Sequence, residues 1–137
     1  MSKIFVQIAS YRDPELVPTI RDLIAKAKYP ENLTFGICWQ RDETESLEEF
    51  TNDPRFRVMD VAYHKSEGLG WARNITQKFW KDEFYTLQID SHHRFVQDWD
   101  MMCIDDYNQS LEFSKKPIIT TYCTPFNPKD DYSIWNQ

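Results

Sequence analysis

This 137-residue sequence has few glycines, few cysteines and no long hydrophobic run. With three glycines and no Gly-rich linker, the chain has no flexible hinge that would divide it into separate domains. The apolar run after Met1 breaks at Gln7, too early for a signal peptide, and no stretch approaches the ~20 apolar residues of a membrane span. The sequence therefore predicts a single domain over residues 1–137, without a membrane segment.

The sparse cysteines exclude two common kinds of small domain. Cys38, Cys103 and Cys123 lack the CxxC spacing of zinc and redox sites, and three thiols cannot complete a disulfide framework. Cys38 and Cys123 lie within apolar runs, so we expect them to be small buried thiols. Free thiols fit a reducing compartment, and we expect a cytoplasmic location.

Basic residues are in deficit, with 16 Lys and Arg against 22 Asp and Glu, which gives a formal net charge of −6. This balance argues against a general nucleic-acid or anionic-membrane binder, because such proteins attract phosphate charge through a basic surface. We expect no nucleic-acid partner. Aromatic residues, in contrast, make up 15% of the chain, which indicates a folded globular domain and not a disordered one.

Strand-like runs and helical periodicities alternate along the chain. Short apolar runs rich in β-forming residues predict strands over residues 4–9, 33–39, 56–63, 84–89 and 117–123. Because these strands alternate with helical patterns, the sequence predicts an α/β fold with a mostly parallel, Rossmann-like sheet flanked by helices. Such sheets bind ligands beyond the carboxyl ends of their strands, so the polar residues at those ends are the candidates for function.

Four helices are predicted between and after these strands. Asp13 and Pro14 are typical of a helix start, as N-cap and first helical residue, and the helical spacing stops at Pro30. The acidic stretch over residues 43–49 predicts a short exposed helix. The other two helices carry apolar residues at four-residue steps: one opens at Gly68 and Gly70 and carries Trp71, Ile75 and Phe79, and the other has Trp99, Cys103, Tyr107 and Leu111 on one face.

Tyr11, Arg12 and Asp13 lie between the first strand and the first helix. A Tyr ring stacks on a base, an Arg offsets phosphate charge and an Asp accepts hydrogen bonds from a ribose or a base imide. The N-terminus of the helix adds attraction for anions. The alternative is that Asp13 only caps the helix and that Arg12 is a solvated charge.

Glycines and positive charges follow the third strand. Gly68 and Gly70 at a helix start allow backbone amides to approach a phosphate closely, and Lys65 and Arg73 flank them with positive charge. The spacing matches neither a GxGxxG fingerprint nor a Walker loop. A tight turn followed by a surface arginine is the alternative interpretation.

The sharpest signal is the Asp90-Ser91-His92 segment after the fourth strand. In extended backbone Asp90 and His92 project on the same side, so that a carboxylate and an imidazole can bind one divalent cation. Oxygen-rich ligation with one nitrogen suits Mn²⁺ or Mg²⁺ better than a closed structural zinc site. The alternative is that Asp90 caps a turn and that His92 and His93 pack locally.

Three segments of the chain resemble the nucleotide-sugar glycosyltransferases of the GT-A fold. They are residues 4–14, 68–74 and 87–95, and the resemblance extends from residue 3 to about residue 124. The last segment is more specifically similar to the GlcNAc-transferase group that modifies protein hydroxyl groups, such as hydroxyproline on a cytoplasmic ubiquitin-ligase adaptor. The resemblance implies a GT-A-like sheet, a UDP-sugar donor and a hydroxyl-bearing protein or glycan acceptor.

The resemblance also implies a role for each matching residue. The segment 11–13 is expected to contact the uridine, and Arg73 to face the diphosphate or the donor sugar. Asp90 is expected near the ribose and a Mn²⁺ or Mg²⁺ ion, with His92 at the metal-ligand end. His92 replaces the second Asp of the usual DxD motif, which removes one negative charge from the metal site.

Enzymes of the GT-A fold are usually much longer than this chain, and their second half supplies the acceptor contacts. The chain is then either a nucleotide-binding half or an unusually small member of this fold. We expect the first, the N-terminal part of a longer, metal-dependent glycosyltransferase that uses UDP-GlcNAc. A non-catalytic nucleotide-sugar-binding module is the alternative. A third hypothesis is a plain α/β interaction domain without a ligand.

Overall fold

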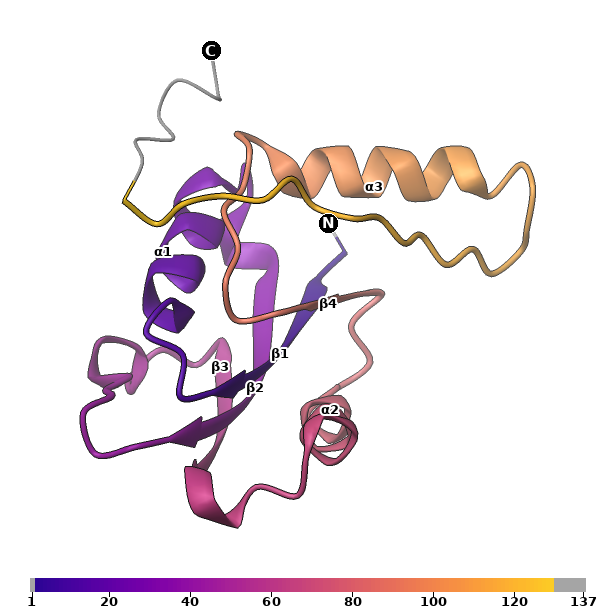
Figure 1. Cartoon of the computed structure of the whole chain (residues 1–137). Helices are drawn as coiled ribbons and strands as arrows, with labels where there is room; N and C mark the ends of the chain where they lie inside the picture. The colour runs from indigo at the N-terminus through magenta and orange to yellow at the C-terminus, as the bar shows by residue number, and fades with distance from the viewer. Residues whose placement is uncertain (1, 130–137) are drawn as a thin grey trace.

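The computed structural model describes residues 2–129 as a four-stranded parallel sheet with helices on its two faces (Figure 1). The prediction of an α/β fold, with a parallel sheet flanked by helices, is thereby confirmed. In the order β3-β2-β1-β4 across the sheet, the strands are Phe56–Ala62, Leu33–Arg41, Ile4–Tyr11 and Tyr85–Ile89.

Strand β1 is the point at which the chain changes direction across the sheet. Strand β1 pairs in parallel with β2 on one side and with β4 on the other. After β1 the chain adds β2 and β3 on one side, and it then returns to add β4 on the other side of β1. At such a switch point an open α/β sheet forms a crevice outside the carboxyl ends of the two strands. The fold therefore places the loops after β1 and β4 at the expected ligand-binding edge.

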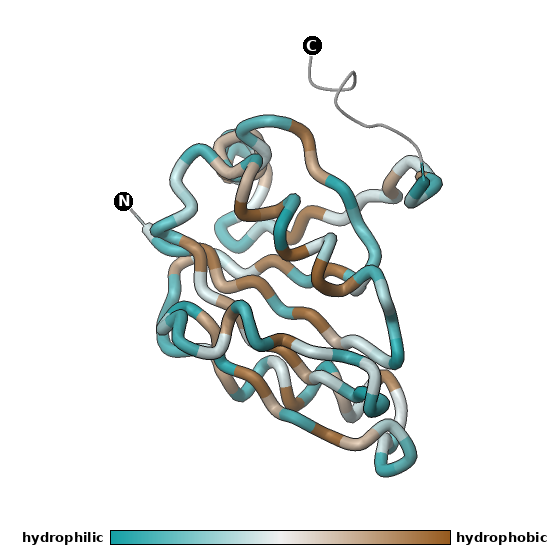
Figure 2. Tube along the Cα trace, turned by 90° about the vertical axis from the view of Figure 1, so that its left-hand side faces the viewer, coloured by the Kyte–Doolittle hydropathy of each residue, from teal (hydrophilic) through white to brown (hydrophobic). Residues whose placement is uncertain are grey.

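Helix α1, Leu16–Lys26, covers one face of the sheet and completes the main hydrophobic core. Leu16, Ile20 and Leu23 recur at helical spacing and are almost fully buried against apolar residues of β1 and β2. Figure 2 shows the hydrophobic segments along the strands inside the molecule, with mostly hydrophilic loops around them. The predicted first helix is confirmed, although it begins two residues after Pro14.

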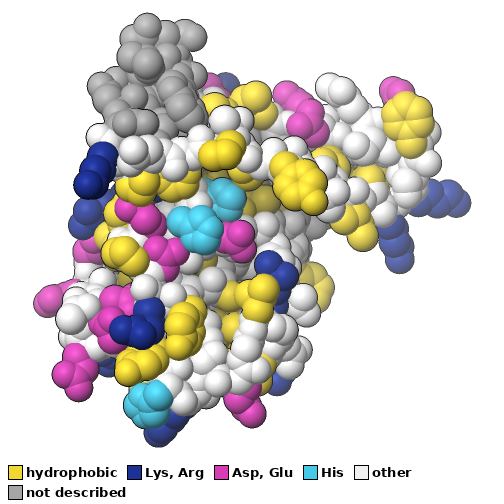
Figure 3. Space-filling model, in the orientation of Figure 1, with side chains coloured by type: hydrophobic (Ala, Val, Ile, Leu, Met, Phe, Trp, Pro, Cys, Tyr) yellow, Lys and Arg dark blue, Asp and Glu magenta, His cyan; other side chains and the backbone are white. Residues whose placement is uncertain are grey.

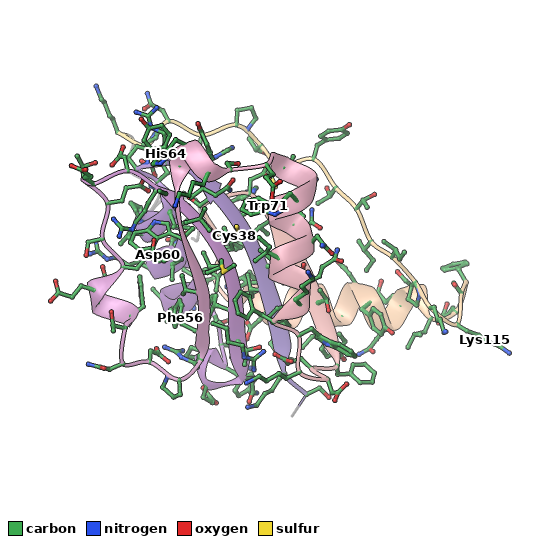
Figure 4. All side chains as sticks on the ribbon, turned by 90° about the horizontal axis from the view of Figure 1, so that it is seen from below. Cys38, Phe56, Asp60, His64, Trp71 and Lys115 are labelled. Atoms are coloured by element: carbon green, nitrogen blue, oxygen red, sulfur yellow. The ribbon has the colours of Figure 1, made fainter. Side chains whose placement is uncertain are left out.

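Helix α2, Leu69–Lys78, packs on the opposite face of the sheet. Cys38 lies on the face that α2 covers (Figure 4), and burial raises the pKa of its thiol to about 11. The predicted buried thiol is confirmed at this position. Gly36 permits the close approach of α2, since a Cβ there would lie 2.5 Å from a ring carbon of Phe5 and 2.9 Å from the carbonyl oxygen of Thr76.

Helix α3, Trp99–Ser110, starts against α1 and then extends away from the sheet (Figure 1). The indole N–H of Trp99 donates a hydrogen bond of 2.8 Å to the carbonyl oxygen of Leu23, and the ring is buried. The predicted single apolar face is only partly packed, because α3 runs past the edge of the sheet and leaves Cys103 and Leu111 exposed. Within residues 2–129 no helix is long and apolar enough to cross a bilayer.

Two predictions for segments outside the core are wrong. Residues 117–123 form no strand, and Cys123 is exposed; β-branched residues favour a strand only where a neighbour pairs with them, and this segment joins no described strand. The stretch 43–49 contributes only to a short 3-10 turn, η2 at Glu48–Phe50. At the start of this stretch the backbone N–H of Thr44 donates a hydrogen bond to the carboxylate of Asp42. Such local side-chain bonds compete with the backbone bonds of a helix.

Candidate functional site

The loops after β1 and β4 meet at the switch point through Asp13 and His92. Nδ1 of His92 lies 2.9 Å from Oδ2 of Asp13, and the Ser91 hydroxyl donates a hydrogen bond of 2.7 Å to the same oxygen. The backbone N–H of Glu15 donates to the other carboxylate oxygen at 2.9 Å. Both oxygens of Asp13 therefore have partners within the protein, whereas the resemblance implies a uridine contact for this residue.

These contacts determine the charge of Asp13. Burial on its own raises the pKa of a carboxyl group, but hydrogen bonds from Ser91, Glu15 and His92 outweigh it and hold the pKa of Asp13 below its ordinary value of 3.8. Asp13 is therefore an ionised carboxylate at neutral pH. An ionised carboxylate only accepts hydrogen bonds.

Thr19 of α1 fixes the backbone on which His92 stands. Its buried hydroxyl lies 3.0 Å from the carbonyl oxygen of Ser91 and accepts a hydrogen bond of 3.0 Å from the N–H of His93. The His93 ring is partly buried, and this burial holds its pKa below the ordinary 6.5. The segment after β4 is thus anchored to a helix and is not a free loop.

Two further contacts anchor the continuation of this segment. Arg94 forms an ion pair of 2.6 Å with Glu15, and the N–H of Phe95 donates a hydrogen bond of 2.6 Å to the carboxylate of Asp22. Sequence reasoning did not find these anchors. A signal was present, because Glu15, Thr19 and Asp22 are polar residues at the spacing of one helix face.

Asp90 faces α2, and Arg73 is its partner. Oδ1 of Asp90 lies 3.6 Å from Nη2 of Arg73, and the two side chains are 55% and 39% exposed. Such an exposed pair contributes little to stability, so both groups remain available to a ligand. The sequence prediction relied on extended backbone to place Asp90 and His92 on the same side. That premise is wrong, because β4 ends at Ile89 and neither residue belongs to a strand.

A pocket of about 430 Å³ nevertheless joins Asp90 and His92. These two residues form part of one wall, and the segment 121–126, exposed up to Pro125, forms another. Figure 3 shows the face that carries the site, with histidine and acidic side chains next to one another and hydrophobic side chains above them. The volume lies within the range of small-molecule sites, roughly 300–1,000 Å³.

A second cluster lies at the ends of β1, β2 and β3. The guanidinium of Arg12 lies 4.4 Å from the ring centroid of Tyr63, and its Nε is 3.7 Å from the carboxylate of Asp42. The backbone of Arg12 is left-handed, with φ of 47°, and its N–H donates to the carbonyl oxygen of Gln40. Tyr11 is 53% exposed and meets Tyr63 edge-on. Sequence reasoning found Tyr11 and Arg12 but missed their partners, although these too follow strand ends.

Gly68 is the N-cap of α2, and Lys65 lies three residues before it. Gly68 has φ of 100°, which favours glycine, and its N–H donates a hydrogen bond of 3.2 Å to the hydroxyl of Ser66. The Ser66 hydroxyl donates to the side chain of Gln40, whose amide donates in turn to the carbonyl oxygen of Ser10. This chain of hydrogen bonds ties the start of α2 to the ends of β1 and β2, while Lys65 is exposed beside it.

The residues present fit a shared divalent cation. Among residues 2–129 no three His, Cys, Asp or Glu side chains are grouped so that they could hold a metal by themselves. A cation that also binds a diphosphate needs fewer protein ligands, because Mg²⁺ usually takes phosphate oxygens and waters as well. The carboxylate of Asp90 and the imidazole of His92 have the required chemistry, and both side chains are more than half exposed.

Comparison with protein families gives the class of this protein. A family model described as glycosyltransferase (GlcNAc) matches residues 3–53 and 44–137, so the two matches together span nearly the whole chain. The protein is thus a glycosyltransferase by family, as the sequence resemblance indicates. Within that class the chain belongs to the GlcNAc glycosyltransferase family. A comparison with curated proteins found none that matches it.

Proposed function

We propose that this protein is a metal-dependent glycosyltransferase that transfers GlcNAc from UDP-GlcNAc to a hydroxyl group of a protein or glycan. The proposal rests on one observation above all: Asp90 and His92 line one pocket beside the switch point of the sheet, and Arg73 pairs with Asp90. Family membership supports the sugar, because the matching family is described by GlcNAc. The proposal goes further than the family in naming donor, metal and acceptor.

The uridine is proposed to bind at the ends of β1 to β3. Tyr11 and Tyr63 offer aromatic rings for the base, and Arg12 brings a positive charge. Hydrogen bonds from Thr44 hold the pKa of Asp42 below its ordinary 3.8, so that this carboxylate is ionised and accepts hydrogen bonds at neutral pH. A base imide N–H is the kind of donor that such a carboxylate binds.

The diphosphate is proposed to lie between the start of α2 and the segment after β4. Arg73 and Lys65 supply positive charge, and Gly68 opens the helix whose first N–H groups favour an anion. Asp90 and His92 would hold Mn²⁺ or Mg²⁺, with Asp90 also near the ribose. When bound, the ion supplies positive charge that stabilises a leaving diphosphate.

These residues fit the charge changes of glycosyl transfer. The bond between the anomeric carbon and the diphosphate oxygen breaks, and both its electrons leave with UDP. The acceptor oxygen bonds to the same carbon and its proton is released to water. Negative charge therefore develops on the diphosphate, where the guanidinium of Arg73 stabilises it best if it is already in position. In the structure the guanidinium of Arg73 lies 3.6 Å from the carboxylate of Asp90, beside the proposed diphosphate position.

The release of UDP from UDP-GlcNAc tests this function. The protein is incubated with donor and Mn²⁺, with and without hydroxyl-bearing peptides, and UDP is quantified against a chelator control. We expect metal-dependent release that Arg73→Ala reduces, with Lys78→Ala, a basic residue in the last turn of the same helix, as the matched control. Binding of UDP without hydrolysis or transfer under any of these conditions would contradict the proposal and favour a non-catalytic nucleotide-sugar-binding module.

A further inference from the structure

His92 is held through one of its two ring nitrogens. Nδ1 lies 2.9 Å from the carboxylate of Asp13, and the side chain of Asp13 is 17% exposed while that of His92 is 58% exposed. Asp13 therefore stands behind the imidazole, on its protein side. Nε2, at the other side of the ring, is the nitrogen that remains for a ligand.

The chemistry of this contact fixes the proton on the ring. An ionised carboxylate has no proton to donate, so a hydrogen bond between Asp13 and a neutral His92 requires the proton to be on Nδ1. Nε2 then carries a lone pair, which is the form of histidine that binds metals. Metal-binding histidines commonly donate their other N–H to a carboxylate in this way, which fixes both tautomer and ring orientation.

We propose that Asp13 is a positioning residue for His92, which sets the Nδ1–H tautomer and aims Nε2 at the cation that accompanies the diphosphate. The inference rests on the proposed metal role of His92. It assigns Asp13 a function other than the uridine contact that the resemblance implies. Both oxygens of Asp13 support the assignment, because Ser91, His92 and Glu15 already occupy them.

The surrounding contacts separate this role from a purely structural one. The backbone from Ser91 to His93 is held by Thr19, and the following residues are held by the Arg94–Glu15 pair. None of these contacts involves the side chain of Asp13. A change at Asp13 therefore leaves the segment anchored and alters the state of the His92 ring.

The tautomer is measurable in the metal-free protein. We expect ¹⁵N NMR of the His92 ring at pH 8, assigned with a His92→Asn variant, to show Nδ1 protonated and Nε2 unprotonated. Asp13→Asn presents an amide N–H that can donate to Nδ1, so the proton should move to Nε2, and Mn²⁺ affinity in the presence of UDP should fall about 10–100-fold. Asp13→Glu, which keeps a carboxylate, should restore part of that affinity. Ser91→Ala, which removes the other side-chain partner of Asp13, should leave the His92 tautomer unchanged.

Two results overturn this inference, and they differ from a failure of the proposed function. The first is a wild-type His92 with its proton on Nε2. The second is an Asp13→Asn variant with unchanged tautomer and unchanged Mn²⁺ affinity, in a protein that does bind Mn²⁺. If the wild-type protein binds no Mn²⁺ with UDP present, the metal role itself fails, and this inference fails with it whatever the tautomer.

Discussion

The buried hydroxyl of Thr19 holds the backbone on both sides of His92, so a substitution of Thr19 perturbs the candidate site without changing any of its proposed ligand-binding residues. It bridges the carbonyl oxygen of Ser91 and the N–H of His93, each at 3.0 Å, and its side chain is fully buried. Thr19→Val keeps the shape but leaves both backbone groups without this partner. An unsatisfied group of this kind costs about 1–3 kcal/mol, and since the His93 N–H is only partly buried we expect a loss of about 2 kcal/mol.

Urea unfolding measures this loss. With a slope of about 1–3 kcal/mol per molar urea, the midpoint should fall by roughly 1 M, and Mn²⁺ affinity should fall as well, because His92 stands on the released backbone. Thr51→Val is the matched control, since Thr51 is exposed and its hydroxyl makes one long contact of 3.5 Å. A midpoint shift for Thr19→Val no larger than that of Thr51→Val would refute the claim that this helix anchors the site.

Three further predictions concern packing, pH and the donor. Gly36→Ala should lower the thermal midpoint, at a cost of about 1–3 kcal/mol, because its new methyl group meets the ring of Phe5 and the backbone of Thr76. The pKa of Asp13 is lower in the folded protein than in the unfolded chain, so its ionised form stabilises the fold. This stabilisation is complete above the pKa of the unfolded state and is lost as the pH falls through the pKa of the folded state. Urea midpoints of Asp13→Asn between about pH 5 and pH 2 should therefore decline less steeply than those of the wild type, and parallel curves would contradict this. Arg73→Ala should leave the urea midpoint almost unchanged, since the side chain is 39% exposed, yet weaken UDP binding about tenfold or more in calorimetry.

The first four strands were predictable because their signals are local. Apolar runs such as 33–39 belong to strands buried on both faces, and β2 is buried along almost its whole length. The fifth predicted strand, 117–123, is richer in β-branched residues than 33–39 and still does not form. Strand formation depends on a partner strand, which composition alone does not reveal.

The candidate site, too, was predictable only in its local features. Each short motif was visible in the sequence, since Asp13, Asp90 and His92 follow strands and Arg73 lies in the first half of a helix. Their pairing was not visible, because it depends on how the chain turns after β4 and on which strands are neighbours in the sheet. The switch between β1 and β4 brings Asp13 to His92, and the turn after Ile89 directs Asp90 to Arg73.

The cluster at the ends of β1, β2 and β3 illustrates a third case. The sequence pattern places Tyr63 at the end of the predicted strand 56–63, where an aromatic residue is ordinarily part of the core. In the structure it stands in the short helix η3, Tyr63–Lys65, and its ring lies under the guanidinium of Arg12. The strand ends one residue earlier than predicted, at Ala62, and Tyr63 therefore belongs to the candidate site and not to the sheet.

Calorimetric titration of UDP, with and without Mn²⁺, tests the central claim most directly. The wild-type protein is compared with Asp90→Ala and with Asp105→Ala, a matched change of an exposed acidic residue on α3. We predict Mn²⁺-dependent binding by the wild type and by Asp105→Ala, and its loss in Asp90→Ala. Binding that is independent of Mn²⁺, or that Asp90→Ala leaves unchanged, would contradict a metal-assisted donor site at the end of β4.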